Sequence, residues 1–340
     1  AGSSPALGTI YKNSSMCGLF ISNYDFKNKN IESIVEKNLR FRGPDGSSGI
    51  LKNNGWISYH SRLAIIDLSS TVNQPVINSD SSQLVFNGEI LNYKELGLHY
   101  FNKEYKSDTF LLNDLIVFEK LNLSELDGFF SFVFIDGDGK IKYACRDKFG
   151  VKPLFFHKSN EQITFASEPN VLQDLFSPSI NEEAVEEYKA FRAPIFEGSF
   201  YNSIQQVDPG HCYINGRFFS AEIELLNAKK SSLSKNNETL KKAINQGVKS
   251  RCVSDAPVGL LLSKGIDSNL IKHTEDFKNM YSVGFCGDED IEYLSDQNID
   301  GLKILNVDKD EFVKAFDYLL NLRKEPLSVP NEVFLYLIAL

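Results

Sequence analysis

The chain has 340 residues, of which 42% are hydrophobic and 24% charged. This length and hydrophobic content are sufficient for two globular domains with their own cores. Its 36 lysines and arginines stand against 45 aspartates and glutamates, giving a formal net charge of −9. This acidic balance argues against nucleic acid or an anionic membrane as the main partner, because phosphate-rich surfaces select basic proteins. The sequence also contains no apolar run of the roughly 18 residues that a membrane span needs.

Residues 1–16 are expected to be a tag or an extension, because they begin with small and polar residues and lack the apolar core of a secretory signal. The five cysteines beyond them are widely spaced and include no short metal-binding pair. Their odd number and their spacing are typical of reduced thiols, so a cytoplasmic location is expected. These cysteines are Cys17, Cys145, Cys212, Cys252 and Cys286.

The first half of the chain consists mainly of short β-rich runs between turn residues. Apolar residues at helical spacing predict a helix over 30–40, and alternating Asp and Gly at 136–139 predict a hairpin turn. The predicted strands are 56–60, 84–86, 129–135 and 141–144. We expect an α+β domain of two antiparallel sheets packed face to face, with few helices outside them.

A polar segment at 231–237 is the best candidate for a linker, because a helical stripe resumes directly after it. Beyond it helices and strands alternate, which is typical of an α/β domain with a parallel sheet. The expected elements are strands at 258–262, 281–285 and 303–307 and helices at 240–248, 269–277 and 311–320. Domains are therefore expected at 17–210 and 237–340, joined by a linker region at 211–236.

The dipeptide Met16-Cys17 places a cysteine where it becomes the first residue once the methionine is removed. Such a residue carries a thiol nucleophile beside an α-amine with a reference pKa near 8, which is partly an unprotonated base at neutral pH. For an arbitrary Met-Cys pair, a small buried cysteine in an edge strand is the more common interpretation. While residues 1–16 remain attached, Cys17 has no free α-amine.

Further motifs favour the catalytic interpretation of Cys17. They are Arg42-Gly43-Pro44-Asp45-Gly46, His60-Ser61-Arg62-Leu63-Ala64-Ile65-Ile66-Asp67, Asn87-Gly88-Glu89-Ile90-Leu91-Asn92, Ser107-Asp108-Thr109, Arg146-Asp147-Lys148-Phe149-Gly150-Val151-Lys152-Pro153-Leu154 and Phe165-Ala166-Ser167-Glu168. In this order they resemble the class II (N-terminal nucleophile) glutamine amidotransferase domain of asparagine synthetases, over roughly residues 17–210. The resemblance implies an αββα sandwich of the Ntn-hydrolase type.

It also implies a glutaminase in which the Cys17 thiol attacks the side-chain amide of glutamine and the α-amine carries the proton. The side-chain amide of Asn87 and the backbone N–H of Gly88 would stabilise the oxyanion. Arg62 would hold the α-carboxylate of glutamine and Asp108 its α-ammonium. The backbone of the segment Arg62, Leu63, Ala64, Ile65 and Ile66 and the residues around Glu89 would complete the pocket.

Taken singly, each of these residues has a structural alternative. Asn87-Gly88 is a common turn, Arg62 can be a surface charge, and Asp108 can cap a helix. Leu91 departs from the family, which usually has a tyrosine after Asn-Gly-Glu-Ile, so the details of the pocket stay open.

A second stretch, residues 254–268, resembles the pyrophosphate (PP) loop of the synthetase domain that follows the glutaminase in this family. That loop reads Ser-Gly-Gly-x-Asp-Ser and binds ATP with Mg²⁺. Here Lys264 replaces the first glycine, where it either adds a contact to phosphate or fills space that the nucleotide needs. By resemblance, ATP would be bound by Leu261, Ser263, Gly265, Asp267, Ser268 and Val283, with Asp267 as the Mg²⁺ ligand.

The favoured function is a glutamine-dependent amidotransferase resembling asparagine synthetase, whose second domain adenylates an acceptor carboxylate with ATP and amidates it. The alternatives are a glutaminase whose second domain does not bind ATP, and a non-catalytic binding or regulatory protein. Glutamine and a carboxylate-bearing small molecule are the expected partners, with a homodimer left open. A Ser-Gly-Glu-Gly-x-Asp-Glu motif typical of the family does not occur, so the second domain is expected to be incomplete.

Overall fold

The computed structural model describes residues 16–27, 29–69, 73–196, 198–214, 217–220 and 237–340. The chain forms two compact units, of which the first lies within residues 15–227 and the second takes in residues 237–340. The predicted extension lies outside the described residues, apart from Met16.

The first unit contains two antiparallel sheets. One has seven strands: β1 (Gly18–Ser22), β2 (Gly46–Ser47), β3 (Leu51–Asn53), β4 (Trp56–Arg62), β9 (Phe155–Ser159), β10 (Gln162–Ala166) and β11 (Ile204–Gln206). The other has six: β5 (Val76–Ile77), β6 (Gln83–Ile90), β7 (Gly128–Ile135), β8 (Ile141–Arg146), β12 (His211–Ile214) and β13 (Arg217–Ser220). The helices are α1 (Ile31–Leu39), α2 (Tyr93–Phe101), α3 (Asp108–Val117), α4 (Pro169–Phe176) and α5 (Glu182–Phe191), with short 3₁₀ turns η1 (Arg40–Arg42) and η2 (Leu123–Glu125).

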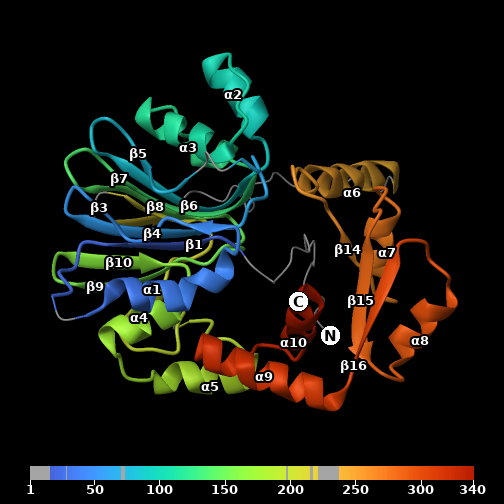
Figure 1. Ribbon diagram of the computed structural model, residues 1–340. Coiled ribbons are helices and arrows are strands. Elements are labelled where there is room, and N and C mark those ends of the chain that lie inside the picture. The colour runs from blue at the N-terminus through green and yellow to red at the C-terminus, as the bar shows by residue number, and fades with distance from the viewer. Residues whose placement is uncertain (1–15, 28, 70–72, 197, 215–216, 221–236) are drawn as a thin grey trace. The chain divides into compact units, whose positions relative to one another are not determined.

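The two sheets pack face to face, with helices on both outer sides (Figure 1). Leu19 and Ile21 of β1 lie in the core between the sheets together with Val85 of β6. Phe20, whose side chain points the opposite way in the strand, packs with Val35 of α1. This is the αββα arrangement that the motifs predict, although the unit has more helices than the sequence pattern indicates.

Strand β1 is central in its sheet, because it pairs with β4 on one side and with β10 on the other. Phe20 lies opposite both Tyr59 and Ala166. Cys17 directly precedes this strand, so the backbone that follows Cys17 is held from both sides.

The second sheet extends beyond the predicted domain boundary. Strand β12 pairs with β8, and β13 pairs with β12. Residues 211–214 and 217–220 therefore contribute strands to the first unit, and the linker predicted from residue 211 does not begin there. The sequence pattern missed both of these strands, each of which is four residues long. The remainder of the predicted linker, 221–236, lies outside the described residues.

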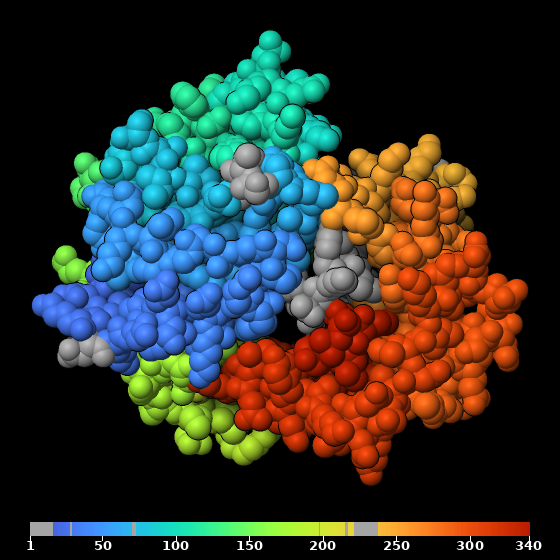
Figure 2. Space-filling model, in the orientation of Figure 1, coloured from blue at the N-terminus to red at the C-terminus, as the bar shows by residue number. Residues whose placement is uncertain are grey.

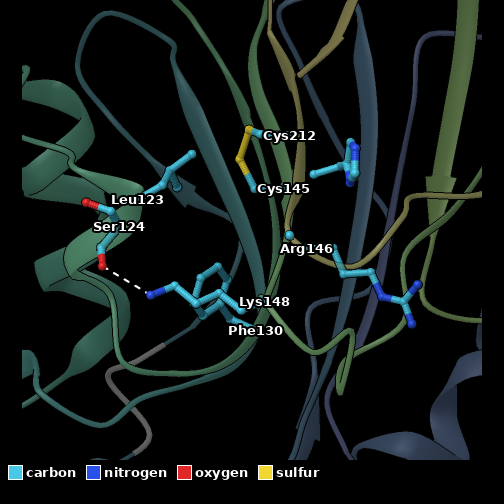
Figure 3. Close-up of a pocket in the computed structure, with 9 residues that line it drawn as sticks. Leu123, Ser124, Phe130, Cys145, Arg146, Lys148 and Cys212 are labelled. Carbon is cyan, nitrogen blue, oxygen red and sulfur yellow. Dashed lines mark hydrogen bonds between the residues drawn. A yellow bond between two sulfur atoms is a disulfide. The ribbon is translucent and has the colours of Figure 1, made fainter. Parts of the chain in front are cut away.

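Cys145 of β8 and Cys212 of β12 lie opposite each other and form a disulfide, with their Cα atoms 4.0 Å apart (Figure 3). The prediction that all cysteines are reduced is wrong for this pair, because a separation of 67 residues conceals their register in the sheet. The small pocket beside the disulfide encloses about 20 Å³, little more than one water molecule needs. At its rim, Lys148 donates a hydrogen bond to the carbonyl oxygen of Ser124.

The second unit is a parallel three-stranded sheet with helices, in the strand order β14, β15, β16. Its core includes Leu260, Met280 and Leu294. The elements are α6 (Asn237–Arg251), β14 (Leu260–Leu261), α7 (Ile266–Lys272), β15 (Met280–Phe285), α8 (Glu289–Asp296), β16 (Leu302–Val307), α9 (Lys309–Arg323) and α10 (Asn331–Ala339). The parallel α/β arrangement confirms the predicted class, but α7 begins and ends earlier than the predicted helix at 269–277.

The helices of the first unit form much of its outer surface. Figure 2 shows α2 and α3 at the outside of the unit, where Leu98 and Phe118 are at least half exposed. Among the described residues, no helix combines the length and apolar character that a bilayer crossing demands.

Candidate active site

The Cys17 thiol lies against the residue that follows β4. Its Sγ accepts a hydrogen bond of 3.3 Å from the backbone N–H of Leu63, and the carbonyl oxygen of Leu63 lies 3.5 Å from the same sulfur. Burial raises the pKa of the Cys17 thiol to about 11. At neutral pH the group is therefore a protonated thiol, which needs a base before it can act as a nucleophile.

Arg42 fixes the backbone of Cys17 from the other side. Its Nε donates a hydrogen bond of 2.9 Å to the carbonyl oxygen of Cys17, and its Nη1 forms an ion pair with Glu168. The two side chains are 5% and 14% exposed, so this is a largely buried pair. The motifs contained both residues, but sequence reasoning gave neither a role.

Asn87 lies in the central part of β6 and is fully buried. Its Nδ2 lies 3.5 Å from Ser167 Oγ, which in turn accepts a hydrogen bond of 3.0 Å from the backbone N–H of Leu19. Within the described structure, Asn87 Oδ1 is buried and without a hydrogen-bond partner. Asn87 is thus tied through Ser167 to the strand that starts beside Cys17.

Gly88, the next residue of β6, occupies a position where only glycine fits. Its φ is +145°, and a Cβ atom would lie 2.1 Å from the carbonyl oxygen of Phe129 in β7. The close approach of these two backbones leaves no room for any side chain.

Asp108 is the first residue of α3 and is 4% exposed. Its carboxylate accepts hydrogen bonds from the backbone N–H groups of Ile90, at 3.0 Å, and Thr109, at 2.8 Å. Burial raises the pKa of Asp108 to about 7, and the charge of nearby Glu89 adds to this rise. No lysine, arginine or histidine in the described part of the chain forms an ion pair with Asp108.

Glu89 has a cationic partner that sequence reasoning missed. The Nζ of Lys152 lies 3.2 Å from Oε2 and 3.4 Å from Oε1 of Glu89, and the two side chains are 8% and 12% exposed. Lys152 belongs to the Arg146–Leu154 motif, which was the only signal of its importance. Since 63 residues separate it from Glu89, no local pattern predicts the pair.

Arg62 ends β4 and is partly buried. Its guanidinium donates hydrogen bonds to the carbonyl oxygens of Asp67 and Ser69. The segment that follows Arg62 is held as well, because the backbone N–H of Ala64 donates a hydrogen bond of 2.8 Å to Asp45. Leu63 and Ile66 are buried, while Ala64 and Ile65 are partly buried.

The candidate ATP site of the second unit gathers several donors. Ser263 Oγ lies 3.0 Å from Ser268 Oγ and accepts a hydrogen bond of 3.2 Å from the backbone N–H of Gly265. The Nζ of Lys264 lies over the ring of Tyr293 in α8, 5.5 Å from its centre. Leu261 ends β14, and Val283 lies in the neighbouring strand β15.

These residues fit a nucleotide with its metal ion, but not a metal ion alone. Hydroxyl and backbone N–H groups are the donors that phosphate oxygens accept from. Asp267 lies in the first turn of α7, and the described residues contain no cluster of three or more His, Cys, Asp and Glu side chains for a metal ion. One carboxylate suits Mg²⁺ only when phosphate oxygens and water supply its other ligands.

Comparison with known proteins gives matches over both units. A family profile described as glutamine amidotransferase domain matches residues 16–223, and one described as asparagine synthase matches residues 239–340. Asparagine synthetase [glutamine-hydrolyzing] 1 of Bacillus subtilis (strain 168) is 29% identical over 325 residues, which cover 88% of this chain and 50% of that protein. The probable asparagine synthetase [glutamine-hydrolyzing] of Acanthamoeba polyphaga mimivirus is 32% identical over 274 residues, which cover 74% and 48%.

Among solved structures, the glutamine phosphoribosylpyrophosphate (PRPP) amidotransferase of B. subtilis, complexed with ADP and GMP, matches 92% of this chain and 80% of its own. The TM-score is 0.43 and the sequence identity 14%. The chain spans about half the length of the curated relatives described above.

Proposed function

Because this chain belongs to the glutamine amidotransferase family, we propose that its first unit hydrolyses glutamine to glutamate and ammonia. The observation that carries this proposal is the position of the Cys17 thiol. It lies beside the Leu63 backbone at the start of a central strand, in a unit where Asp108 is a buried carboxylate without a cationic partner among the described residues.

Removal of residues 1–16 would free the α-amine of Cys17, which would supply the base that the protonated thiol needs. The α-amine would take the thiol proton as Sγ attacks the side-chain carbonyl carbon of glutamine. The Nδ2 of Asn87 and the backbone N–H of Gly88 would donate to the oxyanion, and the α-amine would return the proton to the departing ammonia. Water would then hydrolyse the thioester to glutamate.

Arg62 and Asp108 would hold the two ends of glutamine. A guanidinium binds a carboxylate with two parallel donors, and a buried carboxylate favours an ammonium group. The backbone of residues 63–66 and the residues around Glu89 would complete the pocket.

The second unit would use the ammonia to amidate a carboxylate-bearing small molecule activated with ATP. Ser263, Gly265 and Ser268 would contact the phosphates, and Asp267 would bind Mg²⁺. The backbone of Leu261 and Val283 would contact the adenine. A homodimer and a cytoplasmic location, where ATP is available, belong to this proposal, although a Cys145–Cys212 disulfide is uncommon in that compartment.

A glutaminase without ATP binding is the second candidate. The observation that favours it is the state of the loop, where Ser263, Gly265 and Ser268 bond to one another and Lys264 lies over Tyr293. A nucleotide would have to replace the contacts between the three loop residues.

The decisive experiment compares a protein that begins at Cys17 with the chain as printed. The trimmed form should release glutamate from glutamine, and its Cys17→Ala variant should not. Equal rates of glutamate release in trimmed and extended forms would show that the α-amine is not the base. Activity in the Cys17→Ala variant would exclude the thiol as nucleophile.

A further inference from the structure

Two buried side chains, His60 and Gln74, bind the two backbone groups of Phe86 in β6, and we call them the Phe86 clamp. The Nε2 of His60 lies 3.1 Å from the carbonyl oxygen of Phe86, and the Oε1 of Gln74 accepts a hydrogen bond of 2.6 Å from its backbone N–H. Because a carbonyl oxygen only accepts, Nε2 of His60 carries a proton and is the donor. Loss of either side chain would leave a backbone group of Phe86 without its partner in the interior.

The hydrogen bond of His60 joins the two sheets of the first unit. His60 lies in β4, which pairs with β1, whereas Phe86 belongs to the other sheet. The backbone of His60 is itself fixed, because its N–H donates to Ser48 Oγ at 3.0 Å and its carbonyl oxygen accepts from the Ser48 N–H at 2.9 Å. The sheet that holds the strand after Cys17 is thus tied to the strand that carries Asn87.

The Phe86 clamp holds the outer edge of β6 just before Gly88. Gly88 lies opposite Phe130 of β7, but the N–H and the carbonyl oxygen of Phe130 both bond to Asp147. The backbone N–H of Gly88 therefore points away from β7, to the same edge as the backbone groups of Phe86 two residues earlier. The pairing of β5 with β6 reaches only to Leu84, so at Phe86 side chains hold this edge.

We infer that the Phe86 clamp positions the oxyanion donors of the two residues that follow it, Asn87 and Gly88. His60 and Gln74 are then positioning residues, which act through the backbone of β6 and not by contact with the substrate. Their role rests on the proposed hydrolysis of glutamine. Burial lowers the pKa of His60 to about 3, and its Nε2 proton is bound by Phe86, so His60 is not the proton carrier at neutral pH.

The test compares kcat and KM for glutamine in proteins that begin at Cys17. Donors to an oxyanion act in the transition state and not on the bound substrate, so a loosened clamp should lower kcat and leave KM unchanged. We expect His60→Leu to lower kcat at least about tenfold, since complete loss of one such donor costs about 10²–10³. Gln74→Leu should act in the same direction. In the Cys17→Ala protein, where glutamine is not consumed, adding His60→Leu should change the calorimetric affinity for glutamine by less than about threefold.

Two further variants separate positioning from stability. His60→Gln keeps an N–H donor for the carbonyl oxygen of Phe86, so its kcat should stay within about threefold of the parent. Ser58→Ala is the matched control, because Ser58 Oγ in β4 donates a hydrogen bond of 3.2 Å to Gln83 Oε1 in β6, and both residues are fully buried. Ser58→Ala should lower the urea midpoint, as His60→Leu does, but leave kcat unchanged.

A folded His60→Leu protein with the kcat of the parent would overturn the inference, as would an equal loss of kcat in Ser58→Ala. A weaker affinity for glutamine at constant kcat would also overturn it, because His60 would then act on substrate binding.

If His60→Leu does not fold, His60→Asn replaces it, since its amide is one methylene shorter than that of His60→Gln. A kcat that falls in His60→Asn but not in His60→Gln supports the inference, and equal kcat values in the two would overturn it. Absence of glutamate release by the trimmed parent would defeat the proposed function and the inference together, a result that differs from every outcome above.

Discussion

Arg42 donates a hydrogen bond from Nε to the carbonyl oxygen of Cys17, while its Nη1 pairs with Glu168. The residue that carries the thiol is thus oriented by a buried cation that does not itself touch the sulfur. In the proposed reaction, the backbone direction at Cys17 must let Sγ reach the carbonyl carbon of glutamine while the α-amine reaches the leaving nitrogen.

Arg42→Met should destabilise the first unit, because it leaves the Glu168 carboxylate largely buried without its partner. Breaking a buried ion pair on one side costs about 3–5 kcal/mol. The double variant Arg42→Met/Glu168→Leu should recover most of this free energy of unfolding, but not the glutaminase rate, because the donor to Cys17 stays absent. Urea unfolding and glutamate release measure the two effects. Recovery of both would show that Arg42 has no role at Cys17.

Gly88→Ala should damage both stability and catalysis. The new Cβ would lie 2.1 Å from the Phe129 carbonyl oxygen at a φ of +145°. We expect a loss of about 1–3 kcal/mol in the free energy of unfolding. Displacement of the Gly88 N–H should lower the glutaminase rate by about 10²–10³. Gly46→Ala is the matched control, because no atom lies within 4 Å of its Cβ position. Similar behaviour of the two variants would contradict the assignment.

Glutamine binding to the Cys17→Ala protein should release a proton at roughly pH 6, because a carboxyl with a pKa of about 7 must ionise to hold an ammonium group. Calorimetry in buffers of different ionisation enthalpy should give close to one proton at that pH and almost none at roughly pH 8. Asp108→Asn should abolish the release, whereas Asp114→Asn, in the same helix, should not. Release that persists in Asp108→Asn would assign the proton to another group.

The pH dependence of the free energy of unfolding reports on Asp108 less clearly than proton release does. The folded protein holds the Asp108 proton more tightly than the unfolded chain, so this contribution to the free energy of unfolding falls as the pH rises from about 4 to about 7. Burial lowers the pKa of His60 to about 3, so its contribution rises over much of the same interval. The two slopes offset each other.

The Cys145–Cys212 disulfide closes a segment with a sequence separation of 67 residues. The loop-entropy relation gives a stabilisation of about 4 kcal/mol for such a length. A reductant should therefore lower the urea midpoint of the parent but leave that of Cys145→Ala/Cys212→Ala unchanged. An unchanged parent midpoint, with both thiols titrating in the native protein, would contradict the disulfide.

Lys264→Gly tests the altered loop by calorimetry with Mg-ATP. Weaker binding than in the parent would assign Lys264 a contact with phosphate, and stronger binding would identify it as an obstruction. If Lys264 contacts phosphate, Tyr293→Leu should strengthen Mg-ATP binding, because the variant frees the ammonium group of Lys264 from the ring that it covers. No binding by the parent or by Lys264→Gly, with both folded, would leave the glutaminase without a synthetase partner.

The family and both fold classes were predictable from the sequence, because short motifs and hydrophobic periodicity are local signals. The contacts that organise the candidate site were not predictable from the sequence. Lys152 meets Glu89, and Arg42 meets Glu168, only in the folded unit, and no spacing along the sequence predicts either contact. The helix predicted at 269–277 illustrates a further limit. Its apolar stripe ends at Phe277, which packs into the core beyond α7 and not within it.

The pairing of β1 on both sides has a consequence for how an active enzyme would arise from a longer precursor. Every ladder contact of this strand is made by residues 18–22, downstream of the cleavage point. Cutting the peptide bond before Cys17 would therefore leave the pairings of β1 with β4 and β10 intact, so the new amino terminus would stay beside a strand in the middle of the sheet. If an aminopeptidase or protease cut this bond, β1 itself would not have to form again.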